Sequence, residues 1–161
     1  MGKLNFLENS TRPDIAYATY QCAHFSQDPR ASHSDAKIHL VKYLKATRTQ
    51  RITLDTNRNK IFEVYAGANF VGNWHHPIAD DNPSTAKSRT SYSIMYSVCP
   101  IIWCINMQTQ ITLSTMEVDY IALSQSLWDT IIIMQLLKEI KCNGFHTLSS
   151  IPQVTLQIIQ G

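Results

Sequence analysis

The sequence contains little charge, and this scarcity bears on what the protein can bind. Of its 161 residues, 16% are Asp, Glu, Lys or Arg, against about a quarter in ordinary globular proteins. No charged residue occurs between Arg89 and Glu117, and the net charge is +2. Strong binding to a phosphate backbone needs several Lys or Arg contacts, so this balance does not predict a typical basic nucleic-acid-binding protein.

Several sequence signals are also missing. The four cysteines form no CxxC pair, and the N-terminal residues contain no apolar run typical of a signal peptide. The uncharged stretch 90–116 is interrupted by Ser, Thr, Pro, Asn and Gln, so it lacks the apolar residues of a membrane span. No serine lies in a GxSxG context. We therefore expect free thiols, a cytoplasmic or nuclear location, no membrane partner and no small-molecule substrate.

The pattern of apolar residues predicts two regions. Residues 1–50 contain two amphipathic helices within 12–48, which form a helical lead-in. From about residue 51 to residue 161, short alternating segments predict an α/β domain. Its expected strands are 52–54, 61–66, 90–98, 101–106 and 154–159. The middle strands should form an antiparallel meander, and the last strand should lie parallel to the first.

One long helix is predicted in the second region. Ser114 and Glu117 have the S-x-x-E spacing of a capping box, and Asn143-Gly144 is a stop signal, so the helix should span 115–142. Its expected buried stripe is made of large apolar residues spaced by three or four: Tyr120, Leu123, Leu127, Ile131, Met134, Leu137 and Ile140.

The stretch VYAGANFVGNW, residues 64–74, is unusual for what it lacks. It has the pattern of a buried strand that runs into a turn at Gly72-Asn73. Such strand ends commonly carry a carboxylate in α/β proteins, and this one carries none.

Five segments, in order, carry a resemblance to a known family: STRPDIAYAT, VYAGANFVGNW, AKSRTSYSIMYSVCPIIW, QTQITLSTMEVDYIALSQSL and LLKEI. Together they resemble the C-terminal part of a copia-type LTR retrotransposon polyprotein, where the end of the reverse transcriptase precedes its ribonuclease H domain. The resemblance implies a ribonuclease H-like mixed sheet of five strands, the first three antiparallel. It also implies hydrolysis of RNA in RNA–DNA hybrids by two Mg²⁺ ions held by converging acidic side chains.

The residues at the implied metal-ligand positions depart from the family. The family's strand motif is close to V-D-A-D-F-A-G-N-W, and Gly67 stands at its catalytic Asp. The helix motif is close to S-T-x-E-A-E-Y-I-A-L, and Asp119 replaces its second Glu, one methylene shorter. The fourth-strand motif resembles P-K-V-x-x-x-x-x-E-D, which puts Gly161 at the lost Asp, or Ile158 or Ile159 in a shifted register.

These departures predict an inactive domain. A vestigial Asp119 cannot by itself hold two divalent ions, so we expect no retained metal and no cofactor. The resulting hypothesis is a catalytically inactive polyprotein remnant, truncated at its C-terminus. Two alternatives stay open: a non-enzymatic module that weakly grips hybrid or duplex nucleic acid by shape, and a nuclease with residual activity.

Other candidate sites have simpler explanations. The histidines and aspartates of the loop 75–81 are typical of polar surface, and Cys99 and Cys104 lack the second pair that a zinc site needs. Trp128 lies one step off the predicted stripe, so we expect it to be exposed.

Overall fold

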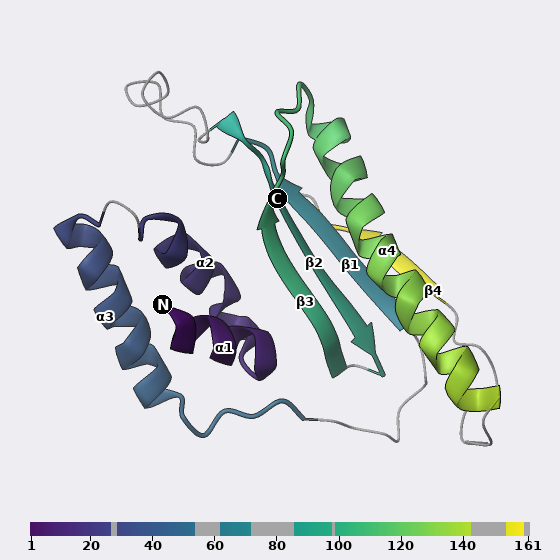
Figure 1. Ribbon diagram of the computed structural model, residues 1–161, viewed down its shortest axis with the longest axis horizontal. Helices are drawn as coiled ribbons and strands as arrows, with labels where there is room; N and C mark the ends of the chain where they lie inside the picture. The colour runs from purple at the N-terminus through teal and green to yellow at the C-terminus, as the bar shows by residue number, and fades with distance from the viewer. Residues whose placement is uncertain (27–28, 54–61, 72–85, 98, 143–153, 160–161) are drawn as a thin grey trace. The chain divides into compact units, whose positions relative to one another are not determined.

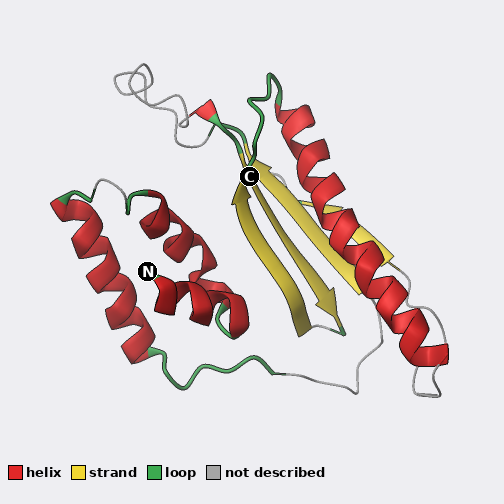
Figure 2. Cartoon of the chain, in the orientation of Figure 1, coloured by secondary structure: helices red, strands yellow, loops and turns green. Residues whose placement is uncertain are grey.

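The chain divides into two compact units, Met1–Leu54 and Asp55–Gly161. The computed structural model describes residues 1–26, 29–53, 62–71, 86–97, 99–142 and 154–159. The first unit is helical, whereas the second contains all the described strands and one long helix (Figure 1, Figure 2).

The first unit contains α1 (Gly2–Ser10), the 3₁₀ turn η1 (Pro13–Ile15), α2 (Ala16–His24) and α3 (Ala31–Ala46). The sequence predicted two helices in this region and missed α1. None of the residues of α1 is buried.

Arg12 joins the beginning and the end of this unit. Its side chain is almost fully buried, and its Nε and Nη2 donate to the Asp14 carboxylate at 2.9 and 2.7 Å. Its Nη1 donates to the Thr47 carbonyl, just beyond α3, at 3.1 Å. The Tyr43 hydroxyl also donates to Asp14, at 3.0 Å. The Arg-Pro-Asp segment of STRPDIAYAT therefore stabilises this unit by hydrogen bonds between its beginning and the end of α3.

Replacing Arg12 with Lys is expected to lower the free energy of unfolding of the first unit by about 1–2 kcal/mol. The ammonium group keeps the charge but loses the planar fork that reaches both Asp14 and Thr47. Urea unfolding followed by circular dichroism measures the change, with the exposed Arg51→Lys as the matched control.

The free energy of unfolding of Arg12→Lys should also depend less on pH than that of the wild type. The hydrogen bond from Arg12 is the main cause of a lowered Asp14 pKa, which burial opposes. Because the folded-state pKa lies below the unfolded value, this stabilisation is present above about pH 4 and disappears as the pH falls through the folded pKa. Identical unfolding profiles between pH 2 and 6 for wild type and Arg12→Lys would contradict this role.

The second unit is built on a mixed sheet with the strand order β3-β2-β1-β4. Its strands are β1 (Phe62–Asn69), β2 (Arg89–Tyr96), β3 (Cys99–Met107) and β4 (Val154–Ile158). The β1–β2 and β2–β3 pairs are antiparallel, and β4 lies parallel to β1. The predicted meander is confirmed, and the last strand is parallel to the first described strand, β1.

The sheet has four strands among the described residues, rather than the five that the resemblance implied. The predicted strand 52–54 was wrong at Ile52 and Thr53, which lie outside any strand, and Leu54 lies outside the described residues. Ile52 and Thr53 belong to the helical unit, where no described strand can pair with them.

Helix α4 (Thr115–Cys142) packs on β1 and β2, as predicted (Figure 1). Phe62, Val64 and Ile94 form the buried centre, and Ile133 and Leu137 of α4 pack against them.

The predicted buried stripe of α4 lies beside the most deeply buried side of the helix: five of its seven residues are half-buried, and it is wrong at Tyr120 and Ile131. The side chains that face the sheet most closely are small ones spaced by four: Val118, Ala122, Ser126 and Thr130. Tyr120 and Ile131 are 64% and 51% exposed. The Ser126 and Thr130 hydroxyls are satisfied by the helix carbonyls of Leu123 and Ser126, so these polar residues can be buried without cost to hydrogen bonding. Their small size lets the helix approach the sheet.

Candidate functional site

Gly67 lies near the end of β1, opposite Ser91 of β2. It is buried, and the Ser91 hydroxyl donates to its carbonyl at 3.3 Å. Position 67 therefore lies on an inner strand of the sheet, between β2 and β4.

The end of β4 covers position 67. The Ile159 amide donates to the Ala66 carbonyl at 2.8 Å, which holds this end of β4 against β1. A Cβ added at Gly67 would lie 2.8 Å from the Ile159 carbonyl oxygen, closer than real Cβ atoms come to backbone. Glycine is therefore required for this approach, and no other side chain fits here unless β4 moves.

Asp119 lies near the start of α4 and is half-buried. It precedes Ala122 by three residues and Ser126 by seven, so helical spacing puts it on the sheet-facing side. None of the described residues donates a hydrogen bond to its carboxylate, which leaves Asp119 as an acid available at this end of the sheet.

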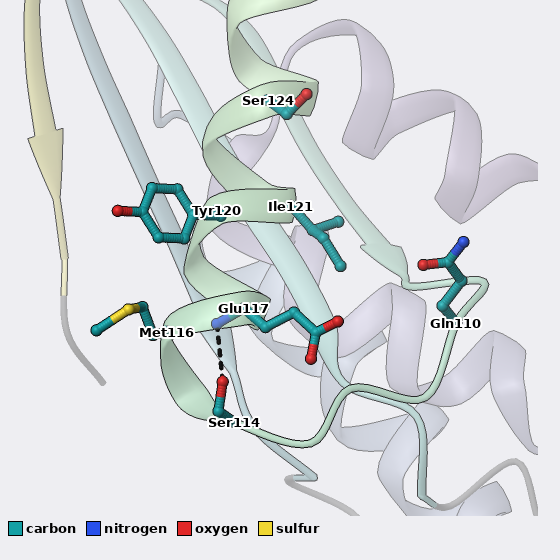
Figure 3. A pocket seen from close by; sticks show the side chains of 7 residues that line it. All are labelled: Gln110, Ser114, Met116, Glu117, Tyr120, Ile121 and Ser124. Atoms are coloured by element: carbon teal, nitrogen blue, oxygen red, sulfur yellow. Dashed lines mark hydrogen bonds between the residues drawn. The ribbon is translucent and has the colours of Figure 1, made fainter.

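Glu117 has a different role, and one of the two hydrogen bonds of the predicted capping box is present. Its backbone amide donates to the Ser114 hydroxyl at 3.2 Å (Figure 3). Its carboxylate accepts the backbone amide of Leu113, the residue before Ser114, at 3.0 Å. Both interactions satisfy donors at the start of α4, so Glu117 is a helix cap.

A buried glutamine that sequence reasoning missed connects α4 to the sheet beside this site. Gln108 is 2% exposed, and its Nε2 donates to the Thr90 hydroxyl at 2.9 Å and to the Val118 carbonyl at 3.1 Å. The backbone amide of Gln108 donates to the Ser88 carbonyl at 2.9 Å. The sequence contains no signal for this bridge, because a glutamine after a strand is typical of an exposed loop.

The structure therefore brings part of the expected site together. Gly67 is in direct contact with Ile159, directly after β4. Gln108 hydrogen-bonds both to Val118, which precedes Asp119, and to Thr90. Thr90 pairs with Ala68, the residue after Gly67. Gly161 lies outside the described residues. Ile158 and Ile159, the alternatives in the shifted register, supply no carboxylate.

These residues do not fit a pair of Mg²⁺ ions. Two ions need several converging oxygen ligands, and Asp119 is the one acid among the expected ligand positions. No group of three metal-ligating side chains occurs within the described part of the chain. The backbone of Ile159, directly after β4, also occupies the place where a side chain at position 67 would begin.

Among the described residues, the other candidates add no second site. The loop 75–81 lies outside the described residues, and Cys99 and Cys104 are not joined in a disulfide. Trp128 is 70% exposed, as expected. A shallow groove of about 430 Å³ lies on the outer side of α4 (Figure 3), and its acid, Glu117, is already occupied in capping.

Comparison with known proteins gives distant relatives. No family model matches the chain, and no solved structure matches it. A retrovirus-related Pol polyprotein from a Nicotiana tabacum TNT 1 transposon is 29% identical over 146 residues, which are 91% of this chain and 10% of that protein. A putative Ty5-1 transposon protein of Saccharomyces cerevisiae is 26% identical, over 80% of this chain and 39% of that protein.

A secreted RxLR effector protein of Plasmopara viticola is also similar, at 25% identity over 78% of this chain and 82% of the effector. The chain spans a tenth of the tobacco polyprotein and about two fifths of the yeast protein. Distant similarity to two retrotransposon proteins supports a transposon-derived protein.

Proposed function

We propose that this protein is a remnant of a copia-type retrotransposon polyprotein, from its reverse transcriptase and ribonuclease H region. Its ancestral domain hydrolysed RNA in RNA–DNA hybrids, and the present domain is catalytically inactive. The observation that carries this proposal is the glycine at position 67, covered by the backbone of Ile159 directly after β4.

The sheet and the relatives support the ancestral part of the proposal. The resemblance implies a mixed sheet whose first three strands are antiparallel, and β1, β2 and β3 are antiparallel while β4 makes the sheet mixed, with four of the five implied strands among the described residues. Two of the relatives are retrotransposon proteins by name.

The chemistry of the site supports inactivity. Hydrolysis by two metals requires ligands that clamp both the attacking and the leaving oxygen of the phosphodiester. Gly67 supplies no ligand, and the shorter Asp119 retreats by about 1 Å relative to Glu, a displacement that can cost on the order of 100-fold in rate.

A labelled RNA–DNA hybrid tests the proposal in one assay for cleavage and binding. With millimolar Mg²⁺, we expect no cleavage above that of Asp119→Asn, which removes the remaining acid. We expect binding to be weak, with a Kd of about 10⁻⁴–10⁻⁶ M that rises steeply with salt, as for non-specific contacts.

Two results would change this conclusion. Mg²⁺-dependent cleavage that Asp119→Asn abolishes would show that a nuclease remains and would overturn the proposal of inactivity. Submicromolar binding to the hybrid without cleavage would favour the non-enzymatic nucleic-acid-binding module instead.

A further inference from the structure

The start of α3, in the helical unit, is capped by a histidine. The backbone amide of Arg30, the N-cap residue, donates to Nδ1 of His33 at 3.1 Å. The Arg30 side chain has no hydrogen-bond acceptor, and the first turn of α3 contains no acidic residue. Among the described residues, His33 therefore makes the only side-chain hydrogen bond at this end of the helix.

The same imidazole also joins α3 to the end of α2. Its ring stacks on the ring of Phe25, the residue directly after α2, with the centroids 4.4 Å apart and the planes 18° apart. The ring of His24, the last residue of α2, meets Phe25 edge-on, with the centroids 5.1 Å apart. One side chain thus caps the start of α3 and contacts the end of α2.

Few other contacts hold the beginning of α3. Leu40 is the one buried residue of this helix, and the hydrogen bond between Arg12 and Thr47 lies beyond the other end of the helix. Residues 31–39 are exposed or half-buried. A segment with so little burial opens at a low cost in free energy, so the cap has a large influence on whether the first turns are formed.

A proton on Nδ1 would remove this cap. Nδ1 accepts a hydrogen bond in the neutral ring, whereas both nitrogens of an imidazolium are donors. An imidazolium at His33 could still stack on Phe25, because an aromatic face attracts a cation, but it would offer the Arg30 amide no acceptor. The stack therefore does not preserve the cap when the ring is charged.

The groups around the ring add no counter-charge to this arrangement. Arg30 adjoins the cap, Lys37 lies one turn further along α3, and the N-terminus of the helix carries a partial positive charge. From α2, His24 is a further group that becomes cationic in acid. Asp35 lies two positions after His33, on a different side of the helix, and Asp28 lies outside the described residues.

We propose that His33 is a pH-sensitive cap: the neutral ring holds the first turns of α3 beside the end of α2, and the protonated ring releases them. Histidine changes its charge between about pH 5 and pH 8, so mild acid is sufficient. The other network of this unit does not change in that range. The hydrogen bond from Arg12 lowers the pKa of Asp14, which therefore remains ionised.

Hydrogen exchange of the full chain tests the proposal at about pH 7.5 and pH 5, with rates expressed relative to those of an unstructured chain. For the amides of residues 33–37, we expect protection in the wild type to fall by about three- to tenfold at the lower pH, the effect of losing a helix cap. His33→Gln supplies an acceptor that does not titrate, as in an ordinary capping box, and should keep the protection at both pH values. His33→Ala should lack it at both.

Two matched controls test other titrating groups. His39→Gln removes an exposed imidazole from the same helix, and Asp28→Asn removes the carboxylate closest to Arg30 in the sequence. Both should respond to pH as the wild type does, and circular dichroism shows that each variant is folded. Equal protection at both pH values in the wild type would overturn the proposal. So would a fall in protection that persists in His33→Gln, or one that Asp28→Asn abolishes.

Discussion

Gly67→Asp is expected to lower the free energy of unfolding of the sheet unit by about 3–5 kcal/mol, the cost of an unpaired charge at a buried position. The new Cβ would meet the Ile159 carbonyl oxygen at 2.8 Å, and the carboxylate would begin under the end of β4. We therefore expect β4 to detach at this end. Urea unfolding measures the loss of stability, and hydrogen exchange at the Ile159 amide reports the release of its bond to Ala66.

Two further variants separate the causes. Gly67→Ala adds the Cβ without a charge and should cost about 1–3 kcal/mol, as overpacking does. Asn69→Asp adds the charge two residues later, where the side chain is exposed, and should change stability by less than about 0.5 kcal/mol.

Mg²⁺ provides the decisive comparison for this site. In Gly67→Asp, Asp119 would be the only other acid at the implied ligand positions that the structure describes. We therefore expect millimolar Mg²⁺ to restore none of the stability that this variant loses. Recovery of stability in Mg²⁺ would mean that position 67 and Asp119 can bind a metal together. Wild-type stability in Gly67→Asp without Mg²⁺ would contradict the close approach of β4.

Gln108→Leu is expected to destabilise the sheet unit by about 1–3 kcal/mol, because the buried Thr90 hydroxyl loses its donor, while removal of the buried Gln108 Oε1, which has no hydrogen-bond partner among the described residues, offsets part of the loss. Leucine is close to glutamine in size and removes the amide that bridges Thr90 and Val118. The matched control is Gln110→Leu, the same substitution at an exposed position two residues later. Urea unfolding of both variants measures the difference.

A double variant tests whether the bridge is the cause. Thr90→Val in the Gln108→Leu background removes the hydroxyl that lost its partner, so we expect the double variant to be more stable than the sum of the two single changes predicts. If the losses of stability of the two single variants add exactly in the double variant, the loss in Gln108→Leu comes from packing and not from the hydrogen bond to Thr90.

The sequence by itself determined the elements whose signals are local. Alternation with a period of two along Tyr92, Ile94 and Tyr96 predicted β2, because successive strand residues face opposite sides. The Ser114 and Glu117 pair located the start of α4, because a capping box acts within one helical turn. The absence of an acid from VYAGANFVGNW could likewise be read from the sequence alone.

The tertiary structure alone decided the features that depend on distant parts of the chain. Which side of α4 is buried follows from the close approach of its small residues to β1 and β2, and hydrophobicity favoured the wrong side at Tyr120 and Ile131. The contact between Gly67 and Ile159 joins residues more than ninety positions apart. The Gln108 bridge needs β2 and α4 already in place. Local patterns encode hydrogen bonding and periodicity along one element, whereas burial and close contact depend on which elements meet.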